Sequence, residues 1–183
     1  LLKSTDFADK EDFIFFSDPD EIPRPELLSN FKLDKKYGIF MQSCFNFKFN
    51  LFNKYENPWE GTRVSKKKNL KSIDFMRQKV RSKNLKYKFY RFDKEKNIQI
   101  FDNAGWHFNN IISPEEISLK LKTFAHSEFA DDKYSSPKVI KKKIDLRMDL
   151  FERGHIYKKK EIDSTFPKYL IDNQDKFKKF IIS

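Results

Sequence analysis

Residues 13–23 read FIFFSDPDEIP, and this stretch decides the expected fold. Its first four residues form a short, continuous apolar run, which is typical of a strand buried on both faces of a sheet. The run leads directly into three acidic side chains, those of Asp18, Asp20 and Glu21. Ligands of open α/β sheets bind beyond the carboxyl ends of the strands, so these acids are well placed for a functional role.

The spacing of Asp18 and Asp20 suits a divalent cation. Two carboxylates two residues apart can present oxygens on one side of a turn and hold Mn²⁺ or Mg²⁺. The chain has 16 aspartates in 183 residues, however, so about 1.4 Asp-x-Asp matches are expected by chance. The triplet alone is therefore no evidence for a metal, and its position after a strand is what favours one.

Helices are expected in four segments. Ser113, Pro114 and Glu116 form a capping pattern that predicts a helix over residues 114–124. A second helix is expected to begin at Ser136-Pro137 and to end near Gly154. Its expected apolar face comprises Ile140, Ile144 and Met148. An amphipathic helix over residues 167–181 and a shorter one over residues 25–31 complete the set.

Strands are expected between these helices. Residues 45–51 alternate between apolar and polar side chains, which predicts a half-buried strand. A hairpin is also expected, because the turn-rich stretch 93–97 is flanked by apolar patterns typical of strands at residues 85–89 and 98–100. Because strands and helices are interleaved, we expect one α/β or mixed α+β domain over residues 1–183.

The net charge of +11 is concentrated in one part of the chain. Residues 63–91 contain twelve lysines and arginines and one acidic residue, Asp74, so this stretch carries the whole excess. A local basic stretch favours an anionic partner such as a nucleotide phosphate, nucleic acid or a membrane surface, and a solvated face is the equally weighted alternative. The single cysteine, Cys44, excludes an intramolecular disulfide and a cysteine-rich zinc site. The apolar runs are too short for a membrane-spanning helix.

Several motifs, in order along the chain, resemble glycosyltransferase family 17. They are SDPDEIPRP (17–25), NPWEGTRV (57–64), AGWHF (104–108), KLKTFAHSEF (120–129) and PKYLIDNQDKFKKF (167–180). The family includes the animal enzyme that adds bisecting N-acetylglucosamine to N-glycans. The resemblance implies a Rossmann-like fold of the GT-A type, a nucleotide-sugar donor, a divalent cation and inversion at the anomeric carbon. Family members carry a further α/β segment before the Asp-x-Asp, so we expect this chain to be the C-terminal two-thirds of such a domain, incomplete at its N-terminus. The alternative is a protein that has lost part of its donor site.

The resemblance also implies site residues. Asp18 and Asp20 would hold Mn²⁺ or Mg²⁺, and His107 or His126 would complete the metal shell, although a lone histidine is more often structural. Glu128 is the first candidate for the catalytic base and Glu21 the second. The candidates for donor or acceptor binding are Trp59, Glu60, Gly61, Arg63, Arg77 and Trp106. The tryptophan rings could stack on a sugar or simply pack in the core.

The sequence thus predicts a metal-dependent inverting glycosyltransferase. It would move a sugar, N-acetylglucosamine by resemblance, from a donor such as UDP-GlcNAc to a hydroxyl of a glycan acceptor. The alternative is a non-catalytic module that binds nucleic acid or an anionic surface through residues 63–91. We prefer the transferase and expect no nucleic-acid partner, because the alternative leaves the acids of residues 18–21 unexplained. The compartment stays open between the cytoplasm, a membrane-associated site and the Golgi lumen.

Overall fold

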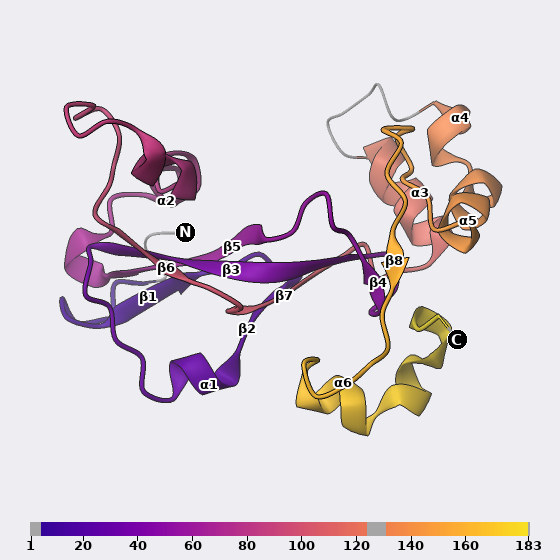
Figure 1. Ribbon diagram of the computed structural model, residues 1–183, viewed down its shortest axis with the longest axis horizontal. Helices are drawn as coiled ribbons and strands as arrows, with labels where there is room; N and C mark the ends of the chain where they lie inside the picture. Colours follow the sequence, from indigo (N-terminus) through magenta and orange to yellow (C-terminus); the bar gives the residue numbers. More distant parts are fainter. Residues whose placement is uncertain (1–4, 124–130, 183) are drawn as a thin grey trace. The chain divides into compact units, whose positions relative to one another are not determined.

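The computed structural model describes residues 5–123 and 131–182 as a mixed α/β structure with a curled, mixed sheet (Figure 1). Two compact units divide the chain. Unit 1 comprises residues 1–43 and 58–107, and unit 2 comprises residues 44–57 and 108–183. The boundary falls within strand β3 (Tyr37–Asn46) and within strand β7 (Gly105–Asn109).

Strand β3 is the centre of the sheet of unit 1. It pairs antiparallel with β5 (Trp59–Lys66), and β5 pairs antiparallel with β1 (Phe13–Phe16). Its first four residues also pair with β6 (Ile98–Phe101), in parallel. The short strand β2 (Glu21–Pro23) pairs antiparallel with β7.

Alternate residues of β3 build separate apolar clusters in unit 1. Tyr37 and Ile39 pack with Met76 and Val80, which belong to or directly follow helix α2 (Ile73–Gln78). Phe40 belongs instead to a cluster that includes partly buried residues in and after helix α1 (Pro25–Leu28). Successive side chains of a strand point to opposite faces, so α2 and α1 cover opposite faces of the sheet (Figure 1). The 3₁₀ turns η2 (Lys67–Asn69) and η3 (Ser82–Lys86) flank α2.

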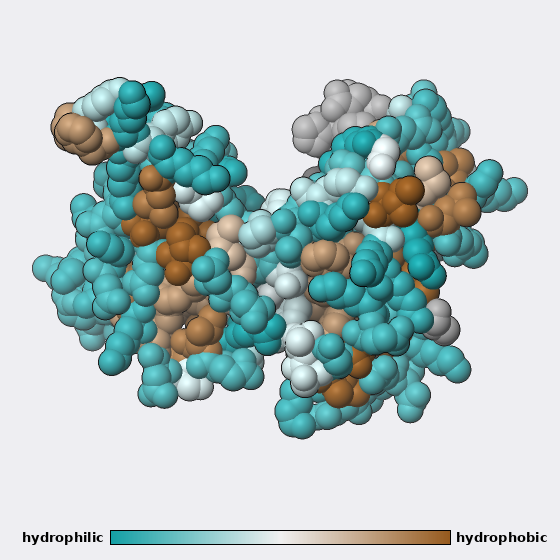
Figure 2. Space-filling model, viewed as in Figure 1, coloured by the Kyte–Doolittle hydropathy of each residue, from teal (hydrophilic) through white to brown (hydrophobic). Residues whose placement is uncertain are grey.

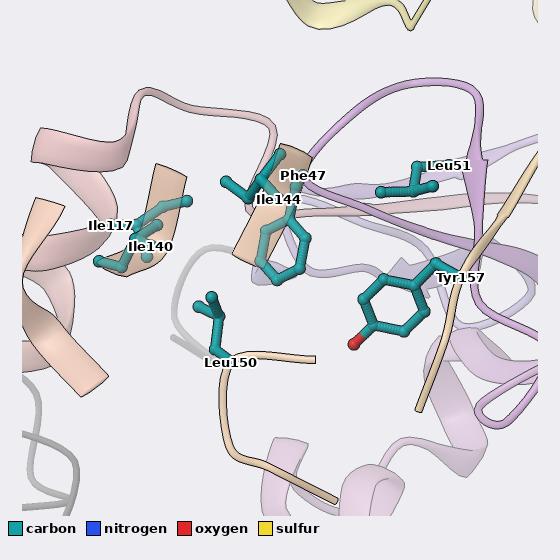
Figure 3. Close-up of a cluster of buried hydrophobic side chains, with 7 residues drawn as sticks. All are labelled: Phe47, Leu51, Ile117, Ile140, Ile144, Leu150 and Tyr157. Carbon is teal, nitrogen blue, oxygen red and sulfur yellow. The ribbon is translucent and has the colours of Figure 1, made fainter. Parts of the chain in front are cut away.

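Unit 2 is mostly helical. Its helices are α3 (Pro114–Thr123), α4 (Asp132–Ser135), α5 (Pro137–Asp145), α6 (Lys168–Asp172) and the 3₁₀ segment η5 (Gln174–Phe180). Strand β4 (Leu51–Phe52) pairs antiparallel with the end of β3 and with β8 (Lys158–Lys159). The buried core draws on the turn after β3, on β4, on α3 and α5, and on the segment after α5 (Figure 3). Its residues are Phe47, Leu51, Ile117, Ile140, Ile144, Leu150 and Tyr157.

The expected helix after Ser113 is confirmed. The Ser113 hydroxyl accepts a hydrogen bond from the Glu116 backbone N–H, and the Glu116 carboxylate accepts one from the Ser113 N–H. These reciprocal bonds are those of a capping box, and they satisfy two otherwise unpaired donors at the start of α3.

The expected helices after residues 136 and 167 are shorter than predicted. Helix α5 ends at Asp145, because Arg147 adopts a φ of 58°, which a helix cannot continue. Met148 therefore lies outside the helix, in an isolated bridge with Ile156. Between α6 and η5, Asn173 leaves helical geometry and its side-chain amide donates to the Tyr169 carbonyl, so the predicted 167–181 helix is two pieces.

Three predictions about strands were wrong. Strand β1 lies at the end of the sheet among the described residues and leaves Phe15 37% exposed, so it is not buried on both faces. Residues 45–51 are not one strand, because β3 ends at Asn46 and β4 begins at Leu51. Residues 47–50 form the turn between them, where Phe47 has a φ of 66°. No hairpin joins residues 85–89 to 98–100, because β6 pairs with β3 instead.

Among the described residues, none of the helices is long and apolar enough to cross a membrane.

Candidate functional site

Unit 1 brings together four of the residues singled out by the sequence. The antiparallel pairing of β2 with β7 sets Glu21 directly opposite His107. Asp20 immediately precedes β2, and Trp59 begins β5. Residues from three separate segments thus meet at one end of β2.

Trp59 and His107 form the aromatic centre of this site. Their rings are stacked, with centroids 4.4 Å apart and planes inclined by 24°. The indole Nε1 donates to Oε1 of Glu21 over 2.8 Å, and Oδ2 of Asp20 lies 3.4 Å from Nε2 of His107. His107 is buried while Trp59 is half-buried. The imidazole therefore has an indole on one face and a carboxylate at its edge.

Glu21 is held by two hydrogen bonds, one to each carboxylate oxygen. Oε1 accepts from Trp59, and Oε2 accepts from the backbone N–H of Asp18 over 3.1 Å. Burial raises the pKa of Glu21, and these two hydrogen bonds oppose part of that effect. Because both oxygens are engaged, the geometry favours a role for Glu21 in positioning the Trp59 ring and closing the turn of residues 18–21.

The two aspartates of the Asp-x-Asp have different partners. Asp18 forms an ion pair with Arg77, with a 2.5 Å contact from the guanidinium to Oδ2, whereas Asp20 lies against His107. Within residues 5–123 and 131–182 there is no group of three His, Cys, Asp or Glu side chains that could hold a metal ion. Asp20 and His107 nevertheless converge as a carboxylate and an imidazole, two donor types that Mn²⁺ accepts.

The other residues of the NPWEGTRV motif have structural contacts. Arg63 is buried and donates to the carbonyls of Glu60, Gly61 and Val80. Burial lowers the pKa of its guanidinium, and Glu60 partly offsets this. The Glu60 carboxylate accepts from the Ser82 N–H. Gly61 is buried against the Gln42 side chain. Glu60 and Arg63 thus tie β5 to the segment after α2.

Trp106 lies away from the Trp59–His107 pair. It neighbours His107 in β7, so its side chain points to the other face of that strand. It is buried, and the Arg24 guanidinium lies over its ring, 4.3 Å from the centroid. Arg24 also donates to the carbonyl and side chain of Asn103. These contacts match the core-packing interpretation of Trp106 rather than the sugar-stacking one.

His126 and Glu128, predicted as a metal ligand and the catalytic base, lie outside the described residues. Their positions relative to Asp20 and His107 therefore stay predictions from the sequence.

A row of hydrogen-bonded polar side chains next to the site, of which Gln42 and Thr62 are buried, escaped the sequence interpretation. The Gln42 amide donates to the Thr62 hydroxyl over 3.3 Å, and the Thr62 and Ser17 hydroxyls are 2.7 Å apart. Ser17 in turn donates to the carbonyl of Glu21. Gln42 is fully buried, and its Oε1 has no hydrogen-bond partner among the described residues. The signal in the sequence that could have indicated this row was Gln42, which lies within the largely apolar YGIFMQSCF (37–45).

The basic stretch 63–91 does not form one uniform surface. Lys66 and Lys68 pair with Glu11, Arg77 with Asp18 and Arg81 with Glu60. The lysines after residue 82 are exposed: Lys83, Lys86 and Lys88. Lys71 and Lys79, on either side of α2, are exposed as well, so lysines that can meet an external anion lie around α2 and at the C-terminal end of the stretch.

No protein-family model, curated protein or solved structure matches this chain. The resemblance to glycosyltransferase family 17 accordingly stays a prediction from the sequence motifs.

Proposed function

We propose that this chain is a glycosyltransferase domain of the GT-A type. It would transfer N-acetylglucosamine from a nucleotide-sugar donor such as UDP-GlcNAc to a glycan hydroxyl, with inversion. The observation that carries the proposal is the convergence of Asp20, His107 and Trp59 in unit 1. It supports the proposal because three motifs of the family resemblance supply one residue each.

Asp20 and His107 are the residues that would hold the divalent cation, with Asp18 two residues away. Mg²⁺ and similar ions in such sites take one or two protein carboxylates, and substrate phosphates and water supply the other ligands. A bound Mn²⁺ would neutralise the charge that develops on the departing diphosphate. Arg77, held against Asp18, adds a positive charge at the same place.

Trp59 is suited to the sugar of the donor or of the acceptor. Its ring is fixed by the stack with His107 and by the hydrogen bond to Glu21, so little side-chain freedom is lost when a ligand binds. An aromatic ring held in this way presents an apolar surface to a pyranose. In this arrangement Glu21 positions the ring.

The reaction also requires a base. A carboxylate within hydrogen-bond reach of the acceptor hydroxyl would take its proton as the oxygen attacks the anomeric carbon. The leaving group is the nucleoside diphosphate. Both oxygens of Glu21 are occupied, so Glu128 remains our first candidate for this step.

The test is release of UDP from UDP-GlcNAc in the presence of Mn²⁺ and an N-glycan acceptor. We expect the Asp20→Asn variant to lose about 10²-fold or more in turnover, because the charge that the diphosphate needs is no longer held in place. Asp34→Asn is the matched control, since Asp34 is an exposed aspartate of the same unit. Equal turnover in the wild-type and Asp20→Asn proteins, or turnover unaffected by removal of Mn²⁺, would refute the proposal.

A further inference from the structure

The segment between η3 and β6 exposes an unusual set of side chains. We call residues 85–92, LKYKFYRF, the aromatic loop. Its five large apolar side chains, Leu85, Tyr87, Phe89, Tyr90 and Phe92, are all exposed. Phe89 is 86% and Phe92 is 89% exposed. In Figure 2, hydrophobic residues lie on the surface at the upper left, where Figure 1 places the segment between η3 and β6.

Two neighbouring phenylalanines that are almost fully exposed indicate a binding surface. Phenylalanine is among the residues most often buried, and single exposed apolar residues are normal whereas clusters mark interaction sites. Phe89 and Phe92 are three residues apart and nearly fully exposed. Together with Tyr87, which precedes them, and Tyr90, which lies between them, they form such a cluster. Nothing about the core of unit 1 needs them, because its clusters contain neither ring.

The loop is held in shape by its own contacts. Arg91 forms a bidentate ion pair with Asp93, in which its Nε and Nη2 donate to the two carboxylate oxygens over 2.7 and 2.8 Å. Its guanidinium lies 5.4 Å from the centroid of the Tyr87 ring. The Lys96 ammonium donates to the carbonyls of Tyr87 and Lys88. Tyr87 is thus held by contacts within the segment, while Phe89 and Phe92 are almost fully exposed.

The surroundings of these rings are basic. Residues 83–96 contain six lysines and arginines against two acidic residues, Asp93 and Glu95. Asp93 is already paired with Arg91 and Lys94. The aromatic loop therefore combines an apolar tip with a positively charged surround.

We propose that the aromatic loop inserts into the surface of an anionic lipid bilayer. Phe89 and Phe92 would enter the boundary between headgroups and acyl chains, Tyr87 and Tyr90 would lie at headgroup level, and the lysines would contact lipid phosphates. The aromatic loop and the lysines around it would thus attach the protein to the membrane, whether or not the protein transfers a sugar.

A bilayer fits the loop better than single-stranded nucleic acid does. Nucleic-acid binding uses aromatic rings as parallel platforms along a basic groove. Here the neighbouring rings of Phe89 and Tyr90 are inclined by 76°, edge to face. Lys88 and Lys94 lie over tyrosine rings, 5.9 and 5.5 Å from the centroids, so they flank the tip without forming a track. The two most exposed rings are phenyl groups without polar atoms, which suits insertion into lipid.

The test is co-sedimentation with vesicles of phosphatidylcholine alone and with added phosphatidylserine. We expect binding only to the vesicles with phosphatidylserine, weakening as salt is added. Phe89→Ser and Phe92→Ser should each reduce the partition coefficient by about 10-fold or more, because each removes a buried phenyl group. Lys86→Ala and Lys88→Ala should each reduce it by about 5-fold.

Phe7→Ser is the matched control, since Phe7 is 89% exposed but lies outside the loop. It should partition like the wild-type protein. All these side chains are exposed, so the variants should keep the circular dichroism spectrum of the wild type. The proposal is overturned if the wild-type protein binds neither vesicle, or if Phe7→Ser has the same effect as Phe89→Ser. It is also overturned if the aromatic loop variants lose binding to oligo(dT) and leave vesicle binding unchanged, which would indicate a nucleic-acid surface.

Discussion

Asp149 is the residue whose replacement should most clearly destabilise unit 2. Its carboxylate is buried and accepts hydrogen bonds from the Phe151 and Arg153 backbone N–H groups and from the Tyr157 hydroxyl. It also forms an ion pair with the Arg153 guanidinium, with a shortest contact of 2.6 Å. One carboxylate therefore organises the segment that follows α5.

The Asp149→Asn substitution keeps the shape of the side chain and removes its charge. The amide group would then face donors, so at least one hydrogen bond to the former carboxylate is lost and the guanidinium loses its counter-charge. Loss of a charged hydrogen-bond partner at a buried site costs about 1.5–3 kcal/mol, and breaking a fully buried pair costs about 3–5 kcal/mol. Because the Arg153 side chain is 42% exposed, solvent screens the pair, and we expect a loss of about 2–3 kcal/mol.

Urea unfolding followed by circular dichroism measures this loss, because helices α3 to α6 all belong to unit 2. Asp145→Asn is the matched control. Asp145 pairs with Lys141 one helical turn away, and both side chains are more than half exposed. The control should change the free energy of unfolding by less than about 0.5 kcal/mol. A loss in Asp149→Asn no larger than in the control would refute the reasoning.

The same substitution has a signature in its pH dependence. Burial by itself would raise the pKa of Asp149, but the hydrogen bonds and charge of Arg153 outweigh it and lower the pKa below the ordinary value of 3.8. A carboxyl group whose pKa is lowered by folding stabilises the protein fully above its unfolded pKa, and this contribution is lost as the pH falls through the folded pKa. The difference between the wild-type and Asp149→Asn proteins should therefore be constant above about pH 5 and shrink below about pH 4. A difference that stays constant down to pH 3 would contradict this assignment.

Four further substitutions, in two matched pairs, test the pairing of β2 with β7 and the start of α3. Gly105 has a φ of 150°, and an added Cβ would lie 2.1 Å from the carbonyl oxygen of Ile22, so Gly105→Ala should separate the two strands and lower the melting temperature. Gly154→Ala should cost only about 1 kcal/mol, because the φ of 75° is unfavourable for alanine but the space around Gly154 is open. Equal losses of stability in the two glycine variants would be evidence against the clash at Gly105. Ser113→Ala should cost about 1 kcal/mol in urea unfolding through loss of the α3 cap, whereas Ser113→Thr should cost little, and equal losses would count against capping.

Local signals in the sequence were sufficient where a structure depends on neighbouring residues. The capping box of α3 is one such case, because Ser113 and Glu116 satisfy each other's backbone donors without help from elsewhere. The Phe13–Phe16 and Ile98–Phe101 strands were also found. The ends of α5 and of the 167–181 segment were not, because they depend on left-handed backbone at Arg147 and on the side chain of Asn173.

The partners of each strand, and the site itself, depend on contacts distant in the sequence. The motifs singled out Asp20, Glu21, Trp59 and His107, but only the pairing of β2 with β7 and the position of β5 bring them together. The sequence could not distinguish Trp59, which is stacked on His107, from Trp106, which lies under Arg24. Composition and local pattern determine which side chains are apolar, charged or capping. Tertiary structure decides which of them meet, because strand pairing joins residues by register and not by sequence distance.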